Sequence, residues 1–142
     1  QIELILDSQQ ALADKSNTTI TNYIDKEISL KADKDSFTTI FSNLINNSIK
    51  YSKDQGKVEI RAIAKKDALI ISISDDGQGI EKQNLSKVFN RFYRTPKARA
   101  NTKGTGLGLA LVKQLANRMN AEVAVESKIG KGSTFFVTFS TK

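Results

Sequence analysis

Two short motifs, about thirty residues apart, carry groups suited to complementary chemistry. Asp75–Ile80 (DDGQGI) places a carboxylate at the end of an apolar run, and Gly77 and Gly79 let the backbone turn there and approach a flat ring. That carboxylate can accept a hydrogen bond from an exocyclic amino group, such as that of adenine. Gly104–Leu109 (GTGLGL) opens a helix, whose unpaired N–H groups and dipole favour phosphates. Together they predict a nucleotide site.

A helix rich in asparagine precedes both motifs. Asn43 and Asn47 are four residues apart and therefore share one face, and Lys50 follows on the same side, away from the apolar stripe. A neutral amide oxygen is a competent ligand for Mg²⁺ when phosphates supply further oxygens. The helix, the acidic turn and the glycine motif together therefore predict a site for ATP and Mg²⁺.

Each motif taken alone also has an ordinary structural interpretation. Asparagines on a helix can form a solvated polar face, Asp-Gly pairs are common in turns, and glycines can simply allow close packing. The glycine motif is not a P-loop, because no Gly-Lys-Ser/Thr follows it, and its spacing does not fit the dinucleotide-binding fingerprint. The order of the motifs along the chain is more specific than any single motif.

Composition narrows the function further. The 142 residues suffice for one domain, 1–142, with a sizeable core, and no apolar run is long enough to span a membrane. The absence of cysteine and histidine excludes disulfides, thiolate metal sites and an imidazole that could act as a base or accept phosphate. The net charge is +7, but few aromatic residues accompany the basic stretch 91–103, so we expect an anionic small molecule or acidic partner rather than nucleic acid.

Hydrophobic periodicity predicts an α/β domain. We expect helices over Ile2–Lys15, from a cap at Asp35 or Ser36 to Tyr51, and over Leu107–Met119 with Leu107, Leu111, Leu115 and Met119 on one face. The segments expected to be strands are Thr18–Ile24, Ile28–Ala32, Val58–Ala64, Leu69–Ser74, Glu122–Glu126 and Ser133–Ser140, and the third and fourth of them form an antiparallel hairpin. We expect at best a short helix over Glu81–Val88 and a mobile loop over Asn90–Lys103.

The combined motifs resemble those of the catalytic ATP-binding domain of bacterial sensor histidine kinases, in the wider ATPase group of gyrase, heat-shock protein 90, histidine kinases and MutL. Asn43–Tyr51 resembles the N box of that family, Asp75–Ile80 its first glycine box, Val88–Arg94 its F box and Gly104–Leu109 its second glycine box. The match covers nearly the whole chain in the order of the family. Asp76 stands where asparagine is common, a difference that we expect to matter little.

The resemblance implies a Bergerat-type (GHKL) fold, a two-layer α/β sandwich in which a mixed, mostly antiparallel sheet packs against helices. It implies that Asp75 specifies adenine, that Asn47 holds Mg²⁺, and that Asn43 and Lys50 help to position the phosphates during catalysis. Lys97, Arg99 and Lys103 in the loop can neutralise charge. The full set of residues expected to contact ATP is Asn43, Asn47, Lys50, Tyr51, Asp75, Gly77, Gly79, Ile80, Lys103, Gly104, Thr105, Gly106, Leu107, Gly108 and Leu109.

The implied activity is transfer of the γ-phosphoryl group of ATP to a histidine on a separate dimerisation domain, with a response regulator receiver domain as the next partner. The chain starts at Gln1 and contains no histidine, so we expect it to be a piece of a longer protein that cannot phosphorylate itself. We expect a cytoplasmic location without direct membrane contact, and the parent protein can be anchored in the inner membrane. A serine kinase or ATPase of the same fold and a nucleotide-binding module without transfer remain alternatives; Asn43, where related hydrolases carry glutamate, argues against hydrolysis.

Overall fold

A mixed sheet of five strands and three α-helices make up the described part of the chain. The structure, a computed structural model, describes residues 1–94 and 106–142. The elements, in chain order, are α1 (Ile2–Lys15), β1 (Thr19–Asn22), α2 (Lys34–Tyr51), β2 (Lys57–Ala64), β3 (Ala68–Asp75), the 3₁₀ turn η1 (Lys82–Asn84), α4 (Gly108–Arg118), β4 (Ala121–Lys128) and β5 (Gly132–Ser140).

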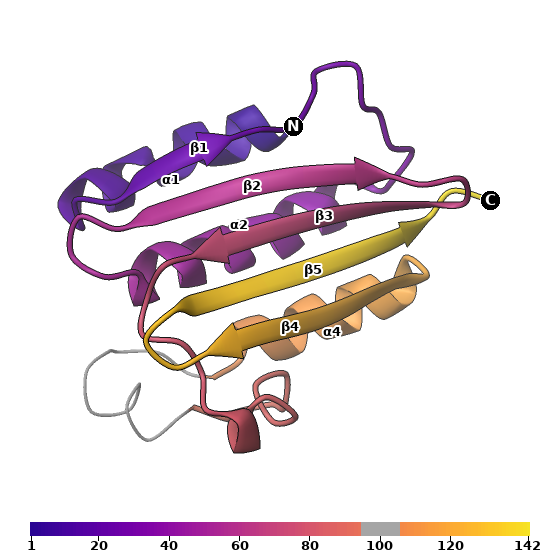
Figure 1. Cartoon of the computed structure of the whole chain (residues 1–142). Helices are drawn as coiled ribbons and strands as arrows, with labels where there is room; N and C mark the ends of the chain where they lie inside the picture. The colour runs from indigo at the N-terminus through magenta and orange to yellow at the C-terminus, as the bar shows by residue number, and fades with distance from the viewer. Residues whose placement is uncertain (95–105) are drawn as a thin grey trace.

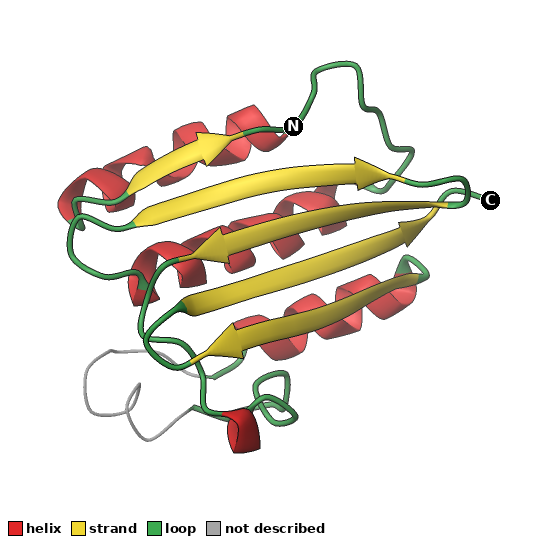
Figure 2. Ribbon diagram, in the orientation of Figure 1, coloured by secondary structure: helices red, strands yellow, loops and turns green. Residues whose placement is uncertain are grey.

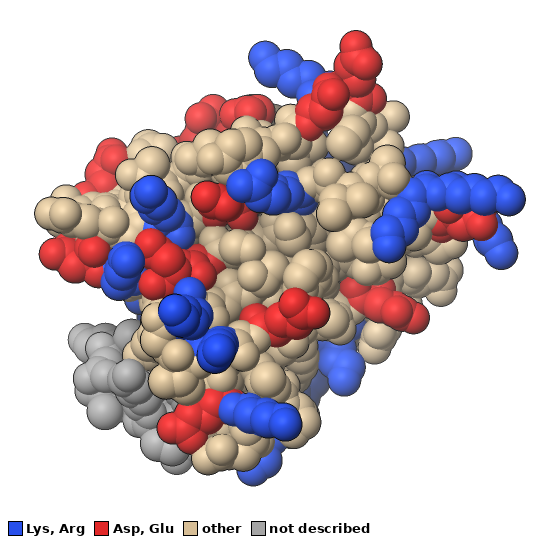
Figure 3. Space-filling view, in the orientation of Figure 1, with Lys and Arg blue, Asp and Glu red and all other residues tan. Residues whose placement is uncertain are grey.

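The strands lie in the order β1-β2-β3-β5-β4, so that β1 and β4 form the edges. β1 runs parallel to β2, whereas the other neighbours are antiparallel. All three α-helices cover one face of the sheet (Figure 1), and the other face is left open (Figure 2). On that open face acidic and basic side chains are interspersed (Figure 3). The two-layer sandwich and the β2–β3 hairpin expected from the sequence are thus confirmed.

The core lies between the sheet and α2, because every second strand residue faces the helices. In β3 the inward side chains are Leu69, Ile71 and Ile73, each at most 4% exposed. On α2 the apolar 3.6-residue period buries Phe41, whose ring lies 6.3 Å from that of Phe139 on β5. This packing fixes α2 over the centre of the sheet, with its last turn near the end of β3.

Two local expectations from the sequence are wrong. Residues 28–32 form no strand: Ile28 and Leu30 pack against the core from an irregular segment, so their alternation reflects burial without a neighbouring strand. The cap of α2 is Asp33, whose backbone is extended and whose carboxylate accepts a hydrogen bond of 2.9 Å from the Ser36 N–H. The Glu81–Val88 segment contains only η1.

Only part of the apolar face expected for α4 packs against the core, where Leu115 and Met119 are partly buried. Val112 and Ala116 are fully buried, whereas Leu107 and Leu111 are 38% and 39% exposed. The leucines recur with a helical period, but the fully buried row of α4 lies one position further along the chain, at Val112 and Ala116. Most of the loop expected over Asn90–Lys103 lies outside the described residues. Across the two described ranges, no helix combines the length and apolarity that crossing a membrane requires.

A buried hydroxyl on α2 provides a test of this packing. Ser48 is 1% exposed, and its Oγ has no hydrogen-bond partner within the described residues. We expect Ser48→Ala to raise the free energy of unfolding by about 1 kcal/mol, because an unpaired buried polar group costs that much or more. Urea denaturation followed by circular dichroism measures the change.

The matched control is Ser52→Ala. The Ser52 hydroxyl donates to the Ile49 carbonyl at 2.9 Å and pairs with the Thr18 hydroxyl at 2.9 Å. The same chemical change should here lower the free energy of unfolding by about 1 kcal/mol. Equal losses in both variants would contradict the packing described for Ser48.

Candidate functional site

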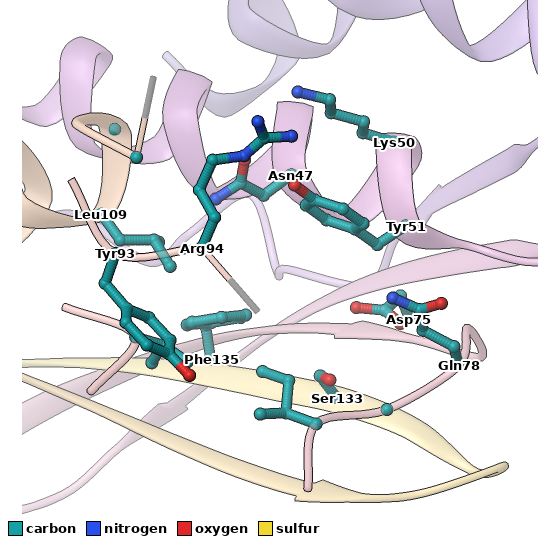
Figure 4. Close-up of a pocket in the computed structure, with 15 residues that line it drawn as sticks. Asn47, Lys50, Tyr51, Asp75, Gln78, Tyr93, Arg94, Leu109, Ser133 and Phe135 are labelled. Atoms are coloured by element: carbon teal, nitrogen blue, oxygen red, sulfur yellow. The ribbon is translucent and has the colours of Figure 1, made fainter. Parts of the chain in front are cut away.

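A pocket of about 250 Å³ opens where β3 ends and β5 begins, between the sheet and the last turns of α2. Figure 4 shows Asn47, Lys50 and Tyr51 on the helix side, with Asp75 and Ser133 on the sheet side. Its lining in the described part of the chain comprises Asn47, Lys50, Tyr51, Asp75, Gln78, Gly79, Ile80, Val88, Tyr93, Arg94, Gly106, Gly108, Leu109, Ser133 and Phe135. A wider hollow of about 520 Å³ beside the start of α1 contains no residue of the three motifs.

The helix α2 supplies the polar wall. Asn47, Lys50 and Tyr51 line the pocket, and the Lys50 ammonium lies 5.7 Å from the centre of the Tyr51 ring. Asn43 lies one turn away and does not line the pocket. Its amide donates to the Thr39 carbonyl at 2.7 Å, and its Oδ1 would lie only 3.0 Å from a Cβ placed on Gly108. Asn43 therefore occupies the contact between α2 and the start of α4.

Asp75 supplies the carboxylate of the sheet side. Its Oδ1 accepts a hydrogen bond of 2.9 Å from the Gly77 N–H. Burial raises its pKa to about 6, the neighbouring Asp76 charge adds to this, and the hydrogen bonds from the Gly77 and Ser133 N–H groups oppose it. Near neutral pH the pocket thus contains an ionised carboxylate that is only partly compensated by donors of the protein.

Asp76 stabilises the turn after β3 through contacts that were not expected from the sequence. Its Oδ1 accepts a hydrogen bond of 3.0 Å from the Lys57 N–H, and its Oδ2 lies 3.7 Å from the Lys53 ammonium. The two adjacent carboxylates therefore do different work. Asp76 ties the turn to the start of β2, and Asp75 faces the pocket.

The glycines of the acidic turn allow close contact with protein backbone. A Cβ on Gly77 would lie 1.9 Å from the Tyr51 carbonyl oxygen, and one on Gly79 would lie 2.3 Å from that of Lys128. Gly79 also has a φ of 77°, which favours glycine. Gly79 and Ile80 line the pocket, whereas Gly77 supports the Asp75 carboxylate through its N–H.

Only the second part of the second glycine motif, from Gly106 to Leu109, belongs to the described residues. Gly106, Gly108 and Leu109 line the pocket, so the first turn of α4 opens toward it. Leu107 is 38% exposed and is not part of the lining. The expectations for Lys103, Gly104 and Thr105, and those for the loop cations Lys97 and Arg99, lie outside the described residues.

Several lining residues were absent from the set expected from the sequence. Gln78, Val88, Tyr93 and Arg94 lie within recognised motifs, but their side chains had no assigned place. The Tyr93 hydroxyl donates to Asn84 Oδ1 at 2.7 Å, which fixes its ring beside the pocket. The others, Ser133 and Phe135, come from β5.

Ser133 could be found only from the strand register. It stands directly opposite Asp75 in the β3–β5 ladder and is 8% exposed. Phe135 lies two residues further on the same face, with its ring 6.1 Å from that of Phe89. The alternation of β5 indicates which face they share, but not which strand lies beside them.

Comparison with known proteins places this chain in a family. The model described as histidine kinase-, DNA gyrase B-, and HSP90-like ATPase matches residues 32–142. The chain belongs to this ATPase family. The resemblance inferred from the order of the motifs is therefore confirmed.

Named relatives of this ATPase domain are sensor kinases. The chain is 38% identical over 137 residues to the phosphate regulon sensor protein PhoR of Pseudomonas aeruginosa, covering 96% of this chain and 31% of that protein. It is 35% identical over 144 residues to the sensor histidine kinase WalK of Bacillus subtilis, covering 99% of this chain and 24% of that protein. The chain thus spans about a quarter to a third of the length of these curated relatives.

Solved structures share the fold. The mycobacterial sensor histidine kinase MprB superimposes with a TM-score of 0.85 at 24% identity, covering 99% of this chain and 95% of that one. Full-length ShkA in complex with AMPPNP also gives a TM-score of 0.85 at 24% identity, covering 99% of this chain and 29% of that one. The two-layer arrangement of the ATPase domain is thus shared with histidine kinases.

The raised pKa of Asp75 yields a prediction with opposite effects on stability and binding. Between pH 4 and pH 6 the native carboxyl holds a proton that the unfolded chain has released, so stability falls as the pH rises through this window. Asp75→Asn removes this cost. We expect a gain in the free energy of unfolding of up to about 3 kcal/mol at pH 7.5, shrinking toward zero near pH 4.

Denaturant unfolding of both proteins across this pH range measures the effect. Calorimetry at pH 7.5 should show in parallel a loss of about ten- to a hundredfold in ADP affinity, since a hydrogen bond to a charged acceptor is lost. Asp76→Asn is the control: its carboxylate is tied to Lys57 and Lys53, so this variant should gain no stability. Unchanged stability and unchanged ADP affinity in Asp75→Asn would together remove Asp75 from the site.

Proposed function

We propose that this domain binds Mg-ATP and donates the γ-phosphoryl group to a histidine on a separate dimerisation domain of the same protein. From there the group passes to the receiver domain of a response regulator. One observation carries the proposal: in a chain of this ATPase family, a single pocket joins a buried carboxylate on the sheet to an amide and an ammonium group on α2. Such a pocket can hold the base and the phosphates of one nucleotide at its two sides.

We assign the base to the sheet side. There the Asp75 carboxylate accepts a hydrogen bond from the exocyclic amino group of adenine, because an ionised carboxylate has acceptor oxygens and no proton to donate. Tyr51, Ile80 and Phe135 offer apolar surface for the flat ring. A hydrogen bond from this amino group also stabilises the negative charge of Asp75, which burial shields from water.

The phosphates are assigned to α2 and the start of α4. Lys50 and Arg94 bring positive charge to the pocket, and N–H groups at Gly108 and Leu109 belong to a helix N-terminus that favours anions. Asn47 offers the amide oxygen for magnesium; bound magnesium would neutralise charge on the β- and γ-phosphates. Among the described residues, no three His, Cys, Asp or Glu side chains form a group that could hold a metal ion. We assign the remaining magnesium ligands to phosphate and water oxygens.

Transfer fits the pocket better than hydrolysis. In transfer, an imidazole nitrogen of the acceptor forms a bond to the γ-phosphorus, the bond to the β–γ bridging oxygen breaks, and ADP leaves. A hydrolase must instead deprotonate water. Asp75 is the only carboxylate in the described lining, and Asn43, whose amide donates to the Thr39 carbonyl, cannot accept a proton as a base. The acceptor therefore brings its own nucleophile.

An exposed apolar surface beside the pocket is suited to the domain that carries this histidine. The F box is divided: Phe89 packs against Phe135 in the core, whereas Phe92 is 65% exposed. The Phe92 N–H donates to the Gly106 carbonyl at 2.9 Å, which fixes Phe92 close to the start of α4. Leu107 and Leu111 add exposed apolar side chains there. We assign this surface to a helical dimerisation domain.

The metal assignment predicts the behaviour of Asn47→Ala. Loss of the amide should weaken magnesium-dependent ATP binding by about ten- to a hundredfold and abolish phosphotransfer in the full-length protein, while the domain stays folded. Magnesium titration of the ATP complex and incorporation of labelled phosphate measure the two effects.

The control for Asn47→Ala is the neighbouring Asn46→Ala. Asn46 points to the other side of α2, where its amide lies 3.4 Å from Gln9 Oε1 on α1. This variant should retain magnesium dependence and phosphotransfer. Identical magnesium titrations for Asn47→Ala and the unmodified protein would contradict the ligand assignment.

The surface assignment predicts that Phe92→Ala separates docking from nucleotide binding. In the full-length protein we expect autophosphorylation to fall severalfold while ADP affinity stays within about twofold, because an exposed ring is removed without a change in the pocket. Ile63→Ala is the matched control, since Ile63 is 57% exposed at the far end of β2. Equal losses of autophosphorylation and ADP affinity in Phe92→Ala would place Phe92 in the local packing instead.

A further inference from the structure

A row of three polar residues crosses the sheet behind the pocket. Asp75 on β3 is paired with Ser133 on β5, and Ser133 is paired with Ser127 on β4. All three point to the helix side, because they continue the inward positions of their strands. Asp75 and Ser133 line the pocket, and Ser127 stands one strand further away.

The Ser127 hydroxyl has three close polar neighbours. Its Oγ accepts a hydrogen bond of 2.7 Å from the Ile80 N–H, donates to the Gly132 carbonyl at 2.8 Å and lies 2.8 Å from Ser133 Oγ. Ile80 belongs to the acidic turn and lines the pocket. The same two segments also meet where the Gly130 N–H donates to the Gln78 carbonyl at 2.9 Å. Ser127 thus connects the β4–β5 hairpin to the turn that follows Asp75.

Counting protons fixes the direction of the bond between the two serines. A hydroxyl has one proton to donate and two lone pairs that accept. The Gly132 carbonyl can only accept, so the single Ser127 proton points to it. One lone pair of Ser127 Oγ accepts the hydrogen bond from the Ile80 N–H, and the second accepts a hydrogen bond from the Ser133 hydroxyl. The Ser133 oxygen is then left with its lone pairs and without a proton for the pocket.

We propose that Ser127 is a positioning residue for nucleobase selection: by accepting a hydrogen bond from the Ser133 hydroxyl, it leaves Ser133 only its lone pairs, as an acceptor beside the Asp75 carboxylate. This inference rests on the proposed function, since it concerns the base of the nucleotide that the pocket binds. Ser127 acts through Ser133 and Ile80 and does not itself contact the base.

Two adjacent acceptors select a purine that carries an amino group at position 6. Such a group has two protons, so it can satisfy both Asp75 and Ser133, directly or through a bridging water. A 6-oxo purine presents an acceptor at the same place and meets the lone pairs of Ser133. Leaving polar groups unpaired in this way discriminates more strongly than differences in apolar contact. The row of three residues therefore favours adenine over hypoxanthine.

The test compares ADP and IDP, which differ at position 6, by calorimetry at pH 7.5. The unmodified chain should prefer ADP. Ser127→Ala frees the Ser133 hydroxyl to rotate and donate to the 6-oxo group, so the ratio of the ADP and IDP affinities should fall by about three- to tenfold. Ser127→Thr retains a hydroxyl on a β-branched side chain suited to a strand and should restore the ratio.

Three further variants isolate the coupling. Ser133→Ala should lower the ratio, and adding Ser127→Ala to it should change the ratio no further, because no hydroxyl remains to be oriented. Ser74→Ala removes a hydroxyl that pairs with Thr134 at 2.7 Å on the opposite face, and the ratio should stay unchanged. If Ser127→Ala does not fold, Ser133→Ala still tests the inference: an unchanged ratio in that variant overturns it, because Ser127 is proposed to act through Ser133.

The outcomes separate two failures. If Ser127→Ala or Ser133→Ala weakens both nucleotides equally, the residue has only a structural role and the inference is overturned, while ADP binding by the unmodified chain still supports the proposed function. If the unmodified chain binds neither nucleotide, the proposed function fails and the inference fails with it.

Discussion

Around the end of β3, three backbone segments approach so closely that no side chain fits between them. A Cβ on Gly132 would lie 1.9 Å from the Asp75 carbonyl oxygen, and the equivalent distances for Gly77 and Gly79 are 1.9 Å to Tyr51 and 2.3 Å to Lys128. The end of α2, the acidic turn and the β4–β5 hairpin therefore all converge on Asp75. This convergence places the polar wall of α2 and the Ser133 hydroxyl of β5 at the pocket, and Ser127 of β4 directly behind it.

This convergence is also what burial of Asp75 requires, and it has an energetic cost. The fold surrounds a carboxylate with backbone and offers it two N–H donors, yet its pKa remains raised to about 6. A carboxylate stabilised only for folding would have received more donors or more solvent. The destabilisation is confined to one residue that faces the pocket, whereas the adjacent Asp76 is well compensated. A locally unfavourable group beside a cavity is typical of a site built for a ligand.

The sequence was sufficient for those features that depend on local pattern. The 3.6-residue period located α2, alternation located β2, apolar and β-branched runs next to turn residues located β3 to β5, and the motif order identified the family. Features that depend on how one helix or strand is placed against its neighbours could not be predicted from the sequence. Ser133 becomes part of the pocket only through its register with Asp75, the burial of Val112 in place of Leu111 depends on how α4 is rotated on the sheet, and the irregular course of residues 28–32 depends on the lack of a strand beside them.

The two edges of the sheet bear on the solubility of the domain. An exposed edge strand is a template on which another chain can add a strand, and such pairing leads to aggregation. β1 offers only four residues for this. β4 is longer, but the charged side chains of Glu122, Glu126 and Lys128 are exposed along it. A second strand paired with β4 would bring its own side chains close to these charges. A second copy of the chain would place carboxylates against carboxylates in several registers, which disfavours self-association through this edge.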